Sequence, residues 1–329
     1  MTPTSLPTAR DELLPVRPRP LLPALRALAI AACVPYLALK IAWIAGSRIG
    51  IPAGSVLLEH RGVMALANSV TVLMDGAVVV LALLLTRPWG LRVRAWLLAV
   101  PIWGATGLLL PIMIGYPVQL LAGAFGGTRT QDSFDRPFLD DWVFGVVYGG
   151  FILQGLTLGA LFLLYSGDRW GHLWRGPVRE LPHFTTGGAL RTLAVLGSLT
   201  ALLPAVTHLL WAAGSSLALS PARGGERTTD FYLLEGVRFA FVAIAVTGTL
   251  TLAFRRGPSL PVKLPLGMAW AGASALGAWG GWLLLTSLTA QADDPKQASA
   301  MLTLTYAVEM ISGFLLTAAV ASWLRRRGA

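Results

Sequence analysis

The chain of 329 residues is 55% hydrophobic and only 13% charged, with a mean hydropathy of +0.65. A soluble globular protein carries about 25% charged residues, so this composition excludes a water-soluble enzyme and a disordered protein. The net charge of +10 comes from short basic clusters between apolar runs, which is typical of membrane orientation signals and not of a nucleic-acid-binding face. A single cysteine, Cys33, excludes an internal disulfide, a CxxC pair and a thiolate zinc site.

The apolar runs predict eight membrane-spanning helices and hence an all-α integral membrane protein. A helix needs about 20 residues to cross about 30 Å of hydrocarbon. Pro101 and Pro111 are expected to kink the third of these helices. The predicted spans are residues 22–45, 62–86, 95–122, 142–165, 189–213, 232–254, 264–290 and 301–324.

The basic residues predict which side of the membrane each loop occupies. With the N-terminus in the cytoplasm, seventeen Lys and Arg residues in the loops and at the span ends lie inside the cell and seven lie outside, in accord with the positive-inside rule. Both termini are therefore expected to be cytoplasmic. Residues 1–21 are rich in Pro and Arg and are expected to form a disordered tail. Residues 166–188 are expected to be a cytoplasmic linker between two halves, 22–165 and 189–329.

The amino-acid composition and the N-terminal segment bear on the location of the protein. Arginine outnumbers lysine 23 to 3, and Ala, Gly and Leu are abundant, which favours a GC-rich bacterial genome and a plasma-membrane location. Residues 30–33, IAAC, resemble a lipoprotein cleavage site, so lipidation at Cys33 is an alternative start. The chain stays apolar after Cys33, whereas a lipoprotein would become polar there.

Two segments of the sequence resemble each other. Residues 40–47, KIAWIAGS, and residues 208–215, HLLWAAGS, share Trp, Ala, Gly and Ser at an offset of 168. Arg87 and Arg255 match at the same offset, and Trp103 matches Trp270 at 167. An Ala- and Gly-rich membrane sequence can produce such matches by chance. Four spans in each half nevertheless return the chain to the same side, so we expect two parallel four-helix repeats around a pseudo-two-fold axis, with a cavity between them.

Residues 35–52, PYLALKIAWIAGSRIGIP, resemble a segment that recurs in uncharacterised polytopic membrane proteins of actinobacteria. The resemblance covers the first span and implies a membrane location. It implies no activity, cofactor or site residue.

Ionisable residues inside the spans are the strongest functional signal. Each costs about 2.5–3.5 kcal/mol at the centre of a membrane helix. Asp75 and Gln154 are expected near mid-membrane, and the other ionisable residues in the outer half, facing a shared vestibule. The candidate proton- or ligand-binding residues are Lys40, Asn68, Asp75, Gln154, His208, Glu235, Arg238 and Glu309.

Each candidate also has a structural interpretation. Asp75, with Asn68 on the same helix face, either fastens two helices or takes up and releases protons. Glu235 and Arg238 are spaced to form a local ion pair. Lys40 and His208 either extend to the outer interface beside tryptophans of the aromatic belt or line the vestibule.

The stripe of Thr305, Tyr306, Glu309 and Ser312 either bonds a neighbouring helix or lines water.

Small residues predict packing seams in two spans. They are Gly145, Gly149, Gly155 and Gly159 in the fourth span, and Ala273, Gly277 and Gly281 in the seventh.

No nucleotide, cofactor or metal motif stands out. The sequence has no GxxxxGK[ST] loop and no HExxH, and its histidines are divided between the two sides of the membrane. Acidic residues in one predicted outer loop could instead suggest magnesium and diphosphate chemistry, although a solvated acidic loop is favoured. These residues are Asp132, Asp135, Asp140 and Asp141.

Three functions fit these features. The first is binding or transport of a small solute or ion through an outward-facing polar cavity, coupled to protons through Asp75 and Glu309. The second is a membrane-embedded enzyme that acts on a lipid or isoprenoid, with one of these carboxylates as general acid. The third is a non-catalytic membrane subunit or sensor. The expected partners are the lipid bilayer and a small solute, with no nucleic acid.

Overall fold

The computed structural model describes residues 21–58, 61–130, 138–182, 186–219, 227–257, 259–289 and 298–328. The predicted tail therefore lies outside the described residues, except for Leu21. Within these ranges the protein is built of helices. The longer ones are α1 (Leu21–Ile44), α2 (Arg61–Thr86), α3 (Ala95–Ala124), α4 (Asp141–Trp170), α5 (Gly188–Thr200), α6 (Leu202–Ala212), α8 (Thr229–Phe254), α9 (Lys263–Ser274), α10 (Gly280–Thr289) and α11 (Ala300–Gly328).

Short helical turns complete the described structure. A π-helical turn, η7 (Ala275–Trp279), joins α9 to α10. The 3-10 turns are η1 (Val56–Leu58), η2 (Pro88–Arg92), η4 (Gly171–Trp174) and η5 (Val178–Glu180).

In the described part of the chain, seven helical segments are long and apolar enough to cross a membrane, which makes this an all-α polytopic membrane protein. The remaining predicted span, 264–290, coincides with α9, η7 and α10, each of which is short by itself. The seven segments are Leu21–Ile44, Met64–Thr86, Ala95–Ala124, Asp141–Trp174, Gly188–Ala212, Thr229–Phe254 and Ala300–Gly328.

Two of the predicted spans, the fifth and the seventh, are interrupted. A proline accounts for the break in the fifth span but not for the one in the seventh. The fifth breaks between α5 and α6, because Pro204 has no N–H to donate to Thr200, four residues earlier, and its ring crowds that carbonyl. The seventh contains the π turn, a feature often found at functional sites. By contrast, α3 is one helix that includes Pro101 and Pro111.

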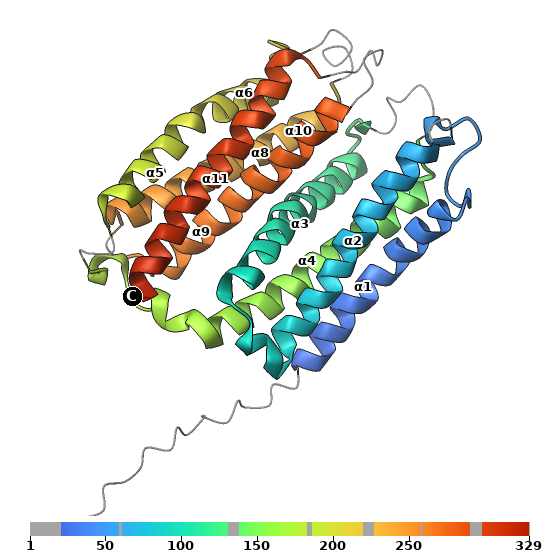
Figure 1. Cartoon of the computed structure of the whole chain (residues 1–329). Helices are drawn as coiled ribbons and strands as arrows, with labels where there is room; N and C mark the ends of the chain where they lie inside the picture. Colours follow the sequence, from blue (N-terminus) through green and yellow to red (C-terminus); the bar gives the residue numbers. More distant parts are fainter. Residues whose placement is uncertain are drawn as a thin grey trace, which may run out of the picture.

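The helices gather in two groups (Figure 1). Helices α1 to α4 lie on one side, coloured blue to green, and α5 to α11 on the other, coloured yellow to red. Helix α3 joins the groups because it packs against α4 on one side and against α8, α9 and η7 on the other. The start of α1 and the end of α11 lie at the same end of the bundle.

The glycine seam predicted for the seventh span is present. Gly277 of η7 lies against Gly313 of α11, with no room for a Cβ on either residue. Gly281 packs on Met310. A second close approach, between α8 and α9, brings Gly248 against the backbone of Ala269.

The seam predicted for the fourth span is wrong for three of its four glycines. A Cβ at Gly145, Gly149 or Gly159 would meet no neighbouring atom within 4 Å, and only Gly155 packs closely, on Met113. Small residues at helical spacing permit a close approach but do not determine which face of the helix meets a neighbour.

The loops that follow α1 and α6 share one hydrogen-bonding pattern. In each, a tryptophan indole donates to a carbonyl six residues later, and a serine hydroxyl accepts from the N–H of that same residue. Gly46 and Gly214 adopt left-handed φ angles of +92° and +94°, which a side chain would strain. The bonds are Trp43 Nε1 to Ile49 O (2.7 Å), Ile49 N to Ser47 Oγ (3.3 Å), Trp211 Nε1 to Leu217 O (2.9 Å) and Leu217 N to Ser215 Oγ (3.2 Å).

We expect Trp211→Phe to lower the free energy of unfolding by about 1 kcal/mol more than Trp323→Phe, because only Trp211 loses a hydrogen bond. Both indoles are buried, but Trp323 Nε1 has no hydrogen-bond partner among the described residues. Thermal unfolding of the two variants in nanodiscs measures the difference. Equal losses would show that the bond to Leu217 adds nothing.

Candidate functional site

The structure places the eight candidate residues in two groups, one in each set of helices. Lys40 is on α1, Asn68 and Asp75 are on α2, and Gln154 is on α4. His208 is on α6, Glu235 and Arg238 are on α8, and Glu309 is on α11. We name His208, Glu235, Arg238 and Glu309 the histidine–carboxylate cluster.

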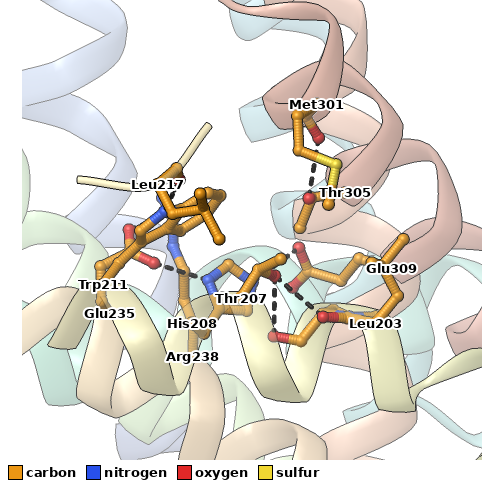
Figure 2. A network of polar contacts seen from close by, with 11 residues as sticks. Leu203, Thr207, His208, Trp211, Leu217, Glu235, Arg238, Met301, Thr305 and Glu309 are labelled. Atoms are coloured by element: carbon orange, nitrogen blue, oxygen red, sulfur yellow. Dashed lines mark hydrogen bonds and ion pairs between the residues drawn. The ribbon is translucent and has the colours of Figure 1, made fainter. Parts of the chain in front are cut away.

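The histidine–carboxylate cluster is a continuous chain of ionisable side chains across three helices (Figure 2). Arg238 Nη1 lies 3.2 Å from one oxygen of Glu235, so the predicted local ion pair is present. The other oxygen of Glu235 lies 2.5 Å from His208 Nδ1. On the far side of the ring, His208 Nε2 lies 3.5 Å from Glu309 Oε2. His208 is fully buried, and Glu235 and Glu309 are 4% and 3% exposed.

The charges of this cluster balance when it holds one proton, on the histidine or on a carboxylate such as Glu309. Arg238 is always positive, and two ionised carboxylates would leave one negative charge inside the bundle. An imidazolium at His208 donates from both ring nitrogens and cancels that charge. A neutral His208 and a protonated Glu309 give the same total. The cluster can therefore hold one exchangeable proton in either place.

Two aromatic side chains contact the cluster. The Arg238 guanidinium lies over the ring of Tyr306, 5.7 Å from its centroid. Trp211 stands edge-on to the His208 ring at 5.6 Å. Trp211 and Trp43 are 1% and 4% exposed, so neither tryptophan lies in a lipid-facing aromatic belt.

The polar stripe on α11 serves partly as a helix contact. The Ser312 hydroxyl lies 2.9 Å from Thr200 Oγ1 on α5, which is the interhelical bond that one interpretation of the stripe predicts. Thr305 bonds within its own helix, to Met301 O at 2.8 Å. Among these residues, Glu309 alone reaches the histidine.

Lys40 does not extend toward the end of its helix. Its ammonium donates to Asn68 Oδ1 at 2.8 Å and lies over the rings of Tyr36 and Trp43, at 5.0 and 4.9 Å. The lysine charge is thus stabilised by an amide and two aromatic faces within the bundle.

Asp75 pairs with an amide. Gln154 Nε2 lies 3.3 and 3.4 Å from the two carboxylate oxygens, and the two residues are 4% and 0% exposed. The contact joins α2 to α4, as expected for a polar group that fastens two helices.

Two adjoining cavities lie beside these groups. The first, of about 400 Å³, is bordered by α3, α4, α8 and η7, and hence by both sets of helices. We name it the Arg238 cavity. Its charged lining residues are Arg129, Asp141, Asp230 and Arg238.

The second, of about 430 Å³, lies between α2 and α3, with Asp75 and Gln154 in its wall. We name it the Asp75 cavity. Both cavities are lined by Ile112, Tyr148 and Trp279.

The expectation of one shared vestibule is not met. Asp75 borders one cavity and Arg238 the other, because α2 packs against α1 and α4 whereas α8 packs against α5, α6 and α9. The lining of the two cavities does not include Lys40, His208, Glu235 or Glu309.

Several lining residues were not identified from the sequence. Tyr148 lines both cavities, and its ring is tilted against that of Tyr116 with the centroids 4.7 Å apart, but an isolated tyrosine in an apolar span gives little signal. Asp230 is in the first turn of α8, outside the predicted span, where its carboxylate accepts from Thr130 N at 3.0 Å. Trp279 ends the π turn, which hydropathy does not reveal.

Within the described ranges, no three His, Cys, Asp or Glu side chains are placed to share a metal ion. Glu235 and Glu309 approach opposite nitrogens of His208, so they do not converge on one point. The acidic residues Asp132 and Asp135 lie outside the described residues. Comparison with protein families, with curated proteins and with solved structures finds no match to this chain.

Proposed function

We propose that this membrane protein binds a small solute in the Arg238 cavity and moves it together with a proton held by the histidine–carboxylate cluster. One observation carries the proposal: Arg238 lines the cavity and at the same time pairs with Glu235. A solute that contacts Arg238 therefore changes the charge balance of Glu235, and through it that of His208 and Glu309. This linkage couples solute binding to uptake or release of the proton.

The lining of the cavity favours a zwitterionic solute. Arg238 and Arg129 can receive a carboxylate, and Asp141 and Asp230 can receive an ammonium group. A volume of about 400 Å³ lies in the range of small-molecule sites. Amino acids have this size and this charge pattern.

We also propose eight spans, formed as two parallel four-helix repeats in a bacterial plasma membrane with both termini in the cytoplasm. In this proposal, the consecutive elements α9, η7 and α10 together form the eighth span. The identical loop bonds after α1 and α6 support the repeat. So does an offset of 158 between α4 and α11, which relates Tyr148 to Tyr306, Gly155 to Gly313 and Leu158 to Leu316.

The proposed repeat also relates the hydrogen bond between Lys40 and Asn68 to the one between His208 and Glu235. Lys40 and His208 are 168 residues apart, and Asn68 and Glu235, their hydrogen-bond partners, are 167 apart. Each half thus places a basic group near the end of its first helix and an acceptor on its second. The proposed axis passes between the halves, where the Arg238 cavity lies.

Uptake by proteoliposomes tests the function. With a mixture of ¹⁴C-labelled amino acids outside, an inward proton gradient should drive accumulation by the purified protein. Glu309→Gln should lower this accumulation by about tenfold, because the cluster can no longer exchange its proton.

The matched control is Asp140→Asn, the same loss of one charge at an exposed residue that lines neither cavity. It should accumulate label as the unmodified protein does. Gradient-driven uptake that is unchanged in Glu309→Gln would overturn the proton role. No uptake of any amino acid by the unmodified protein would overturn the zwitterionic solute.

A further inference from the structure

The Asp75 cavity combines an apolar wall with two buried acceptor groups. Most of its lining is aliphatic or aromatic, including Tyr36, Phe151, Trp279 and Trp282. Asp75 and Gln154 are buried polar side chains in this wall, and the buried Tyr36 adds a hydroxyl group. Such a site suits a molecule that is mostly apolar and carries one polar head.

The orientation of Gln154 is fixed by its neighbour. An ionised carboxylate only accepts hydrogen bonds, so the amide must present Nε2 to Asp75. Gln154 Oε1 is then left buried without a hydrogen-bond partner in the described part of the chain. A buried acceptor without a partner costs about 1–3 kcal/mol, and a ligand that donates to it removes this cost.

Among the described residues, Lys40 is the cation whose charge acts on Asp75, but no ion pair joins the two side chains. The Lys40 ammonium bonds Asn68, which is seven residues and hence about 10 Å earlier along α2. Its charge is also held by the rings of Tyr36 and Trp43. The carboxylate of Asp75 has the Gln154 amide as its hydrogen-bond donor.

The Asp75 cavity lies between α2 and α3, which are less closely packed than α8 and α9, the corresponding helices of the proposed repeat. In the other half α8 and α9 meet through Gly248 and Gly272, whereas the cavity separates α2 from α3. Met74 of α2 lines the cavity and is 38% exposed, and Leu73 beside it is 74% exposed. A ligand dissolved in the bilayer can therefore reach the site from the side of the bundle.

We propose that the Asp75 cavity binds a lipophilic amine in its ammonium form. The ammonium donates N–H bonds to the Asp75 carboxylate and to Gln154 Oε1, and its charge is stabilised by the surrounding aromatic rings. The apolar part fills the remainder of the cavity between α2 and α3. This site is distinct from the Arg238 cavity of the proposed function, and the two proposals can be tested independently.

Three ligands that share a phenylpropyl group test the proposal on the full chain in nanodiscs. They are 3-phenylpropylamine, the neutral 3-phenylpropan-1-ol and the quaternary N,N,N-trimethyl-3-phenylpropylammonium ion, titrated by calorimetry. The amine should bind about tenfold more tightly than either analogue. Equal binding of the alcohol would overturn the role of the carboxylate, and equal binding of the quaternary ion would overturn the two N–H bonds.

Variants assign the binding to this cavity. Asp75→Asn should weaken amine binding about tenfold, and Gln154→Met should weaken it about threefold, while Asp140→Asn should bind as the unmodified protein does. Unchanged binding in Asp75→Asn would overturn the site. If Asp75→Asn fails to fold, the three-ligand comparison and Gln154→Met decide the question. Amine binding that persists when amino-acid uptake is absent would separate this inference from the proposed function.

Discussion

Replacing Glu235 with leucine is expected to lower the free energy of unfolding by about 3–5 kcal/mol, the usual cost of breaking a buried ion pair. Glu235 uses one oxygen for Arg238 and the other for His208, at 3.2 and 2.5 Å. Leucine removes both contacts and leaves the guanidinium, whose side chain is 17% exposed, without its carboxylate. Thermal or denaturant unfolding in nanodiscs measures the loss.

Glu180→Leu is the matched control. Glu180 also pairs with an arginine, Arg179, but at 3.8 Å and with both side chains more than 60% exposed. Exposed pairs contribute at most about 1 kcal/mol, so this variant should unfold nearly as the unmodified protein does. The double variant Glu235→Leu with Arg238→Leu should recover part of the lost stability, since no unpaired charge remains. Similar losses in Glu235→Leu and Glu180→Leu would contradict the assignment of a buried pair.

The sequence predicts the positions of the helices well, because hydropathy and the length of a crossing are local properties. The first span was expected at 22–45 and α1 is Leu21–Ile44; the eighth was expected at 301–324 and α11 is Ala300–Gly328. The ion pair of Glu235 and Arg238 was also predictable, since residues three apart on one helix are neighbours whatever the fold.

Contacts between helices were not predictable in the same way. The energetic cost of a charge in lipid marks His208 and Glu309 as residues that need partners, but the choice of partner depends on how each helix is rotated about its axis. The division of the candidates between two cavities follows from that rotation and from the position of α3 between the two groups. The π turn at 275–279 was equally hidden, because an extra residue in a helical turn leaves hydropathy unchanged.

The second large effect is expected at the seam between α11 and the π turn. Gly313→Ala should destabilise the protein by about 1–3 kcal/mol, as overpacking of a closed contact does. A Cβ at Gly313 would collide with the backbone of Gly277 and would lie 2.8 Å from the carbonyl oxygen of Ala273. Neither is a flexible side chain, so α11 and η7 would have to separate. Unfolding measurements in nanodiscs record the loss.

Gly149→Ala on α4 is the matched control. A Cβ there meets no neighbouring atom within 4 Å, and alanine favours a helix over glycine by about 1 kcal/mol. This variant should therefore be as stable as the unmodified protein or slightly more so. A loss at Gly149 equal to that at Gly313 would indicate a general intolerance of alanine and would contradict the seam.

Gly313→Ala should also weaken ligand binding in both cavities. A seam that only stabilises the fold would not have this effect. Gly277 is two residues before Trp279, and Trp279 lines both the Arg238 cavity and the Asp75 cavity. Displacement of η7 by Gly313→Ala moves this shared wall, so amino-acid uptake and amine binding should both weaken. Gly149→Ala should leave both unchanged. Loss of stability with both binding activities intact would mean that the position of Trp279 is not set by the contact between Gly277 and Gly313.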